Sequence, residues 1–139
     1  MSHGVVLDAA AFDGLDSAEG RMVRQTLREA LERGQDTRCA AVTLAEVCRG
    51  SDRTRRVEAA LARRRGGRRI VVVPTDERLA KLVGAILHKT NRGSEDIADA
   101  HVVAVCASFD TAVVITSDPD DILALAAAIP GTRVVARRP

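Results

Sequence analysis

Short runs of consecutive apolar residues alternate along the chain with longer segments in which apolar residues recur every three to four positions. The runs predict buried strands at residues 5–7, 39–42, 70–73, 112–115 and 133–136. The periodic segments predict helices at residues 9–12, 22–33, 43–48, 53–65, 76–89, 96–107 and 119–129. Apolar strands that alternate with helices are typical of a parallel sheet covered on both faces. We therefore expect a three-layer α/β/α fold with a parallel sheet of about five strands.

The length of 139 residues is typical of one domain, and no linker or repeat divides residues 1–139. No apolar run approaches the roughly 18–20 residues of a membrane span, and the first residues do not resemble a targeting signal. We therefore expect a cytoplasmic protein that does not contact a membrane. The three cysteines, Cys39, Cys48 and Cys106, have apolar neighbours and no zinc-ligand spacing, so we expect them to be small buried side chains.

The charge of the chain changes this picture only slightly. The net charge is +2, and all but two of the 21 basic residues are arginine. Arginine favours bidentate contacts to phosphate and carboxylate groups. Because the chain lacks Trp and Tyr, a nucleic-acid site that stacks bases on aromatic rings is disfavoured. Binding to nucleic acid would instead depend on charge or on a metal ion.

Acidic residues follow three of the predicted strands. Asp8 ends the first strand, Glu46 lies one helical turn after the second, and Asp118 follows the fourth. The carboxyl ends of parallel strands share one edge of the sheet, so these three side chains are expected to converge there. Asp99 lies near the start of an apolar helix, and Asp96 precedes it by one turn on the same helical face.

Each of these acids also has a structural interpretation. Thr43 and Glu46 have the spacing of a capping box, and Asp118 before Pro119 is a good N-cap. Asp8 could cap the turn that follows it, and Asp96 could interact favourably with a helix dipole. Capping alone, however, gives no reason for the acids to gather at one edge of the sheet.

Four carboxylates at one edge would repel one another unless a cation neutralised them. Mg²⁺ and Mn²⁺ prefer oxygen ligands, whereas zinc is disfavoured because no His or Cys accompanies the acids. A carboxylate-bound Mg²⁺ can activate water and stabilise charge on phosphate oxygens. The pattern is therefore typical of phosphodiester hydrolysis.

Four segments, in order, resemble the acidic motifs of PIN-domain nucleases. They are Val5-Val6-Leu7-Asp8, Thr43-Leu44-Ala45-Glu46-Val47 followed by Arg49-Gly50, Asp96-Ile97-Ala98-Asp99-Ala100-His101-Val102-Val103, and Val114-Ile115-Thr116-Ser117-Asp118-Pro119-Asp120-Asp121. The resemblance covers nearly the whole chain, and it is strongest to the toxin component of VapBC toxin–antitoxin systems.

The resemblance implies a Mg²⁺-dependent ribonuclease, with Mn²⁺ as a substitute, that forms a homodimer. It implies inhibition by a VapB-type antitoxin whose C-terminal segment covers the acidic pocket. It implies that the metal ligands are Asp8, Glu46, Asp99 and Asp118, with Asp96 nearby as a secondary ligand. It also implies that Thr116 or Ser117 hydrogen-bonds a ligand, water or phosphate. One departure is that Ala9-Ala10 follows the first acid, where the family often has Thr or Ser.

The strongest basic run has two interpretations. As candidate RNA contacts, its arginines and Arg49 would hold the RNA backbone beside the acidic pocket. Alternatively, the run is a solvated helix end whose cations suit the helix dipole. The arginines of the run are Arg63, Arg64, Arg65, Arg68 and Arg69.

Other functions compete with the nuclease. A phosphoaspartate hydrolase would require Asp two residues after Asp8, where the chain has Ala10, and a receiver domain would require a lysine on the last strand. Two alternatives stay open: a non-catalytic PIN-like binding module, and a PIN nuclease that processes RNA outside a toxin–antitoxin system. His101 lies about 200° around the helix from Asp99, so we expect it to be structural rather than a general base.

Overall fold

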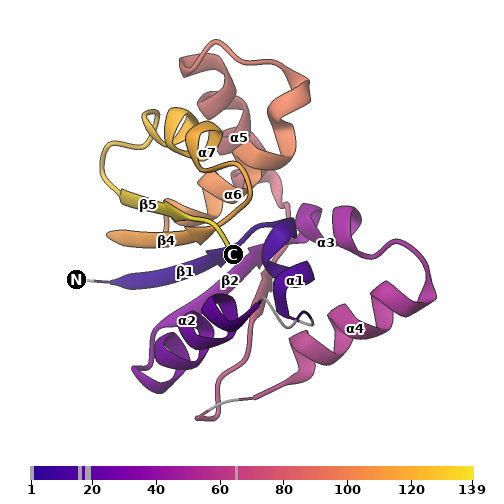
Figure 1. Cartoon of the computed structure of the whole chain (residues 1–139). Coiled ribbons are helices and arrows are strands. Elements are labelled where there is room, and N and C mark those ends of the chain that lie inside the picture. Colours follow the sequence, from indigo (N-terminus) through magenta and orange to yellow (C-terminus); the bar gives the residue numbers. More distant parts are fainter. Residues whose placement is uncertain (1, 16, 18–19, 65) are drawn as a thin grey trace.

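The computed structural model describes residues 2–15, 17, 20–64 and 66–139. Its centre is a five-stranded sheet in the order β3-β2-β1-β4-β5, in which every neighbouring pair is parallel (Figure 1). The strands are β1 (His3–Leu7), β2 (Asp36–Ala40), β3 (Val71–Val73), β4 (Thr111–Ile115) and β5 (Arg133–Arg137). The expected α/β class with a parallel five-stranded sheet is confirmed.

Helices cover both faces of the sheet. They are α1 (Ala9–Leu15), α2 (Arg21–Glu32), α3 (Ala41–Val47), α4 (Ser51–Ala62), α5 (Glu77–Lys89), the 3₁₀ helix η1 (Ser94–Asp96), α6 (Ile97–Cys106) and α7 (Pro119–Ala126). The α1, α2 and α4 helices lie on one side of the sheet and α5, α6 and α7 on the other (Figure 1). Among these helices none is long and apolar enough to cross a membrane.

Two apolar cores result, one on each face of the sheet. Successive side chains of a strand point to opposite faces, so Val6 packs in the core of α5–α7 while Val5 and Leu7 pack in the core that includes α1 and α2. Burial raises the pKa of the Cys39 and Cys106 thiols to about 12, so both are protonated at neutral pH. The expectation of buried cysteines is confirmed for these two.

Several boundaries differ from the predicted ones. Strand β2 occupies residues 36–40 rather than 39–42, and the next helix already begins at Ala41. Strand β2 begins with polar residues, so no apolar run marks its start. Asp36 at this start forms ion pairs with Arg38 and Arg68. Helix α4 ends at Ala62 rather than at residue 65, and α7 ends at residue 126 rather than 129.

Candidate active site

Asp8 lies directly after β1 at the carboxyl edge of the sheet and is 6% exposed. Its backbone N–H continues the sheet by donating to the Ile115 carbonyl at 3.0 Å. The Thr116 hydroxyl donates to Oδ2 at 2.7 Å, and the Ala9 N–H donates to Oδ1 at 2.8 Å. The same hydroxyl accepts the Asp118 N–H at 3.0 Å. Both carboxylate oxygens of Asp8 are therefore held in place, and the fully buried Thr116 acts on Asp8 and Asp118 rather than on a ligand directly.

Glu46 comes from α3, which begins at the residue after β2. Ala40 is the N-cap of this helix, with an extended backbone and no side-chain cap. Thr43 therefore lies inside the helix, so the predicted capping box is wrong. Glu46 is exposed, and its pKa is raised first by partial burial and second by Asp8, whereas Arg49 lowers it.

Asp99 lies in the first turn of α6 and is half-buried. Its pKa is raised to about 6, first by burial and then by the negative charges of four neighbouring carboxylates. In order of effect, these carboxylates are Asp8, Asp118, Asp121 and Glu46. The structure thus brings the four acids named from the sequence into one electrostatic cluster, which we call the acidic cluster and which also includes Asp121.

Asp118 is the N-cap of α7, and Pro119 follows it as the first helical residue. The expected backbone position is confirmed, but the Asp118 side chain makes no capping hydrogen bond and is exposed. Asp121 lies three residues later on the same helical face, and it was not identified from the sequence as a site residue. The spacing Asp118-Pro119-Asp120-Asp121 was the signal that could have identified it.

Asp96 behaves differently from the other acids. It lies in η1, just before α6 begins at Ile97, rather than on the same helix as Asp99. Arg92 approaches Asp96 at 3.7 Å and Asp121 at 3.2 Å. Asp96 is not among the charges that raise the pKa of Asp99. Arg92 therefore neutralises the outer part of the site, on the side of η1 and α7.

The inner carboxylates have few partners. In the described residues, the side chains of Glu46, Asp99 and Asp118 form no hydrogen bond or ion pair, whereas Asp8 accepts two hydrogen bonds. No three His, Cys, Asp or Glu side chains in residues 2–15, 17, 20–64 and 66–139 are placed so that they could hold one metal ion. The donor chemistry still fits a hard divalent cation, because oxygen ligands suit Mg²⁺ and neighbouring carboxylates contribute to the raised pKa values of Glu46 and Asp99.

The remaining candidate residues near this edge are more exposed. The Arg49 side chain folds back on α3 and donates from Nε to the Ala45 carbonyl at 2.8 Å. Ser117 is exposed between Thr116 and Asp118, and its carbonyl accepts a hydrogen bond from Arg138 at 2.8 Å. The hydroxyl of Ser117 is therefore the one better placed to meet a ligand.

The basic run lies at the opposite edge of the sheet. It follows the end of α4 and precedes β3, so its described arginines lie near the amino end of that strand. Strand register places Val71 of β3 and Val6 of β1 level with Arg38 of β2. Arg69 lies two residues before that level and Asp8 two residues after it. The two residues are therefore separated by roughly 13 Å along the strands. The run is not beside the acidic cluster, and Arg65 lies outside the described residues.

His101 turns away from the acids, as expected from its position on the helix. It is 5% exposed, and its Nδ1 contacts the Ile97 carbonyl one turn earlier at 2.7 Å. It is absent from the groups that shift the pKa of Asp99.

A family model of the PIN domain matches residues 6–128. The chain belongs to the PIN-domain family. The match begins in β1 and ends after α7, so it contains every member of the acidic cluster. PIN domains are generally nucleases, which agrees with the hydrolytic chemistry inferred from the acids. A search of curated protein sequences found no match.

The PIN fold is also evident from a solved structure. The chain is similar to a chain in the crystal structure of VapBC2 from Rickettsia felis bound to a DNA fragment from their promoter. The TM-score is 0.64 over 96% of this chain and 98% of that chain, with 13% sequence identity. At this identity the likeness concerns the fold.

Proposed function

We propose that this PIN domain is a Mg²⁺- or Mn²⁺-dependent endoribonuclease and the toxin of a type II toxin–antitoxin module. The observation that carries the proposal is the acidic cluster, in which burial and then the charges of four other carboxylates raise the pKa of Asp99 to about 6. Such a cluster favours a divalent cation, and the PIN family supplies the expectation of nucleic-acid hydrolysis. The similarity of the fold to a chain of a VapBC complex supports the toxin assignment.

Within this proposal Asp8, Glu46, Asp99 and Asp118 would hold the cation, which would activate a water and neutralise charge on the phosphate. Thr116 orients Asp8 through the 2.7 Å hydrogen bond. Protonation of Asp99, whose pKa is about 6 without metal, would weaken cation binding. At subsaturating Mg²⁺ activity should therefore fall as the pH drops through about 6, and saturating Mg²⁺ should move this fall to lower pH.

Cleavage of a labelled RNA by the purified protein tests the catalytic part of the proposal. We expect cleavage with Mg²⁺ or Mn²⁺, none in EDTA, and a loss of at least about 100-fold in Asp8→Asn and Asp99→Asn, since each removes charge that holds the ion. Asp120→Asn is the matched control, because Asp120 is exposed on α7 and does not affect Asp99. Equal cleavage by wild type and Asp99→Asn would rule out this site. If the folded protein binds RNA but does not cleave it with Mg²⁺ or Mn²⁺, the non-catalytic binding module would be favoured.

Growth of a bacterium that expresses the chain tests the toxin assignment. We expect arrest with wild type, growth with Asp8→Asn at equal protein level, and rescue by a small protein encoded beside the gene. Unaffected growth at confirmed expression, together with RNA cleavage in vitro, would favour an RNA-processing nuclease instead. Within the toxin proposal the protein acts in the cytoplasm as a homodimer, which sedimentation of the purified chain would reveal.

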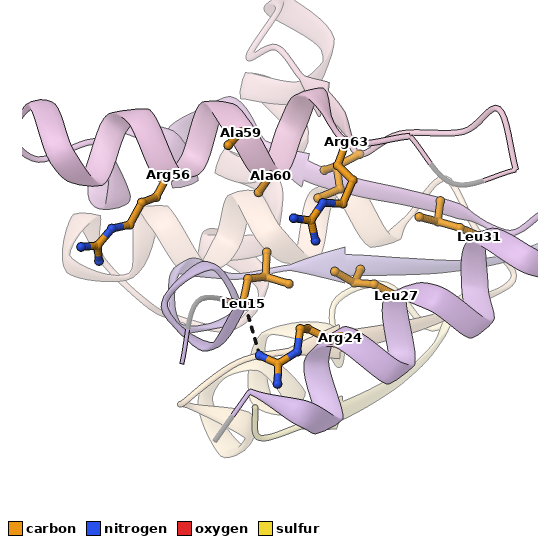
Figure 2. Close-up of a pocket in the computed structure, with 9 residues that line it drawn as sticks. Leu15, Arg24, Leu27, Leu31, Arg56, Ala59, Ala60 and Arg63 are labelled. Atoms are coloured by element: carbon orange, nitrogen blue, oxygen red, sulfur yellow. Dashed lines mark hydrogen bonds between the residues drawn. The ribbon is translucent and has the colours of Figure 1, made fainter. Parts of the chain in front are cut away.

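A groove on the α1–α2–α4 side fits a second segment of the antitoxin of this proposal, distinct from the C-terminal segment that would cover the acidic pocket. Leu15 of α1, Leu27 and Leu31 of α2, and Ala59 and Ala60 of α4 line this groove (Figure 2). Its cavity measures about 160 Å³. The arginines at its rim are Arg24, Arg56 and Arg63. An apolar floor with a cationic rim complements an amphipathic segment that carries acidic side chains.

Charge reversal at the rim tests this part of the proposal separately. Arg56→Glu and Arg63→Glu should weaken binding of the antitoxin at least tenfold and leave RNA cleavage unchanged, since both lie away from the acidic cluster. Arg28→Glu on the exposed face of α2 makes the same charge change outside the groove and should bind as wild type. Equal weakening in all three variants would show that net charge, not the groove, determines binding.

A further inference from the structure

A second cavity lies at the amino end of β2 and β3, against the end of α2. It measures about 360 Å³, and three arginines line it, Arg64, Arg68 and Arg69. The loop that carries them contains Gly66 and Gly67, whose φ angles of 59° and 77° are in the left-handed region that favours glycine. This backbone turn brings arginines from both ends of the loop to one cavity.

The charge of the cavity is positive although a carboxylate lines it. Asp36 accepts hydrogen bonds from Arg68 at 3.1 Å and from Arg38 at 3.1 Å, so two cations already neutralise it. Arg64 and Arg69 form no ion pair with a carboxylate of the described residues. Two guanidinium groups are therefore left for an anion, and the planar guanidinium suits the oxygens of phosphate.

Thr37 of β2 also lines the cavity. It is 1% exposed, and its Oγ1 is buried without a hydrogen-bond partner in the described part of the chain. Because this hydroxyl is closed to solvent, the arginines are the groups that an anion in the cavity would contact.

We propose that this cavity, lined by Arg64, Arg68 and Arg69, is a phosphate-binding site separate from the acidic cluster. It lies at the opposite edge of the parallel sheet from Asp8, so it holds a phosphate group that is not the one undergoing hydrolysis. The phosphate is either a free anion or part of an RNA strand. The site does not depend on the proposed ribonuclease activity, because binding at this edge requires none of the acids.

Thermal melts followed by circular dichroism test the site with inorganic phosphate. Phosphate should raise the melting temperature of wild type above that in chloride at equal ionic strength. Arg64→Ala/Arg69→Ala should lose this shift. Arg28→Ala/Arg133→Ala, which removes two exposed arginines elsewhere, is the control and should retain the full shift.

A second arm identifies the source of the phosphate by the anisotropy of a labelled single-stranded RNA in EDTA. If the site holds an RNA phosphate, the Arg64/Arg69 double variant binds more weakly than the control. The slope of its log affinity against log salt concentration is then shallower by about 0.7 for each phosphate that the variant no longer neutralises. If both variants bind RNA equally while only the control keeps the phosphate shift, the ligand is a free phosphate. No phosphate shift in wild type beyond that of chloride, or an undiminished shift in the Arg64/Arg69 variant, would overturn the proposal.

Discussion

At the scale of single residues, the electrostatics of Asp99 connect the stability of the fold to its chemistry. The pKa of this carboxyl is about 6 in the folded protein against an ordinary value of 3.8. A group that binds its proton more tightly in the folded state destabilises that state once it ionises. The contribution of Asp99 to the free energy of unfolding therefore decreases as the pH rises from about 4 to about 6, and the whole decrease is present at neutral pH.

Replacing Asp99 by Asn should raise the melting temperature of the metal-free protein at pH 7.5, because the substitution removes the ionised group. This increase in melting temperature should become smaller toward pH 4, where the Asp99 carboxyl of wild type is protonated. Calorimetry or circular dichroism is the appropriate measurement, since the chain has no Trp or Tyr. Asp120→Asn is the control. A lower melting temperature for Asp99→Asn in EDTA at pH 7.5 would instead identify a structural acid.

Thr116 connects two members of the acidic cluster through one hydroxyl. Thr116→Val keeps the shape but removes both the donor to Asp8 and the acceptor of the Asp118 N–H. We expect the free energy of unfolding to fall by about 1–3 kcal/mol and cleavage by about 10–100-fold. Thr116→Ser, which keeps the hydroxyl, should restore most of both. Full cleavage activity in Thr116→Val would show that Asp8 needs no such support.

At the scale of elements, the strand–helix alternation was predictable because buried strands and amphipathic helices have distinct hydrophobic periods. The residue at which α3 begins was not predictable in this way. The pattern Thr43-x-x-Glu46 has the spacing of a capping box, but packing after β2 starts the helix two residues before Thr43. Strand β2 also begins with a polar residue, Asp36, which forms an ion pair with Arg68 far along the chain. Local sequence does not contain that information.

The position of Thr43 inside α3 leads to a prediction opposite to that of a capping box. Its hydroxyl is buried without a partner in the described residues, so Thr43→Val should leave the free energy of unfolding unchanged or raise it. A capping-box threonine would instead lose about 0.5–2 kcal/mol. Urea denaturation followed by circular dichroism distinguishes the two. A clear loss of stability in Thr43→Val would contradict the helix start described above.

At the scale of the whole molecule, the parallel sheet separates two groups of charged side chains. Acids that are distant in sequence meet at the carboxyl edge, and this convergence was predictable because all parallel strands end there. The charges of Asp121 and Arg92 were not identified as part of the site, because their place depends on how α7 packs beside η1. The described arginines of the basic run lie at the opposite edge, because a segment that precedes a parallel strand lies at the amino edge of the sheet. Of the two interpretations of this run, contacts to RNA beside the acidic pocket are therefore excluded.

The most direct test of the central claim, that the acidic cluster binds a divalent cation, is calorimetric titration of the metal-free protein with Mn²⁺ or Mg²⁺ at pH 7.5. We predict binding to wild type, affinity at least tenfold weaker in Asp99→Asn, and wild-type affinity in Asp120→Asn. Absence of binding to wild type, or equal affinity in wild type and Asp99→Asn, would contradict the account.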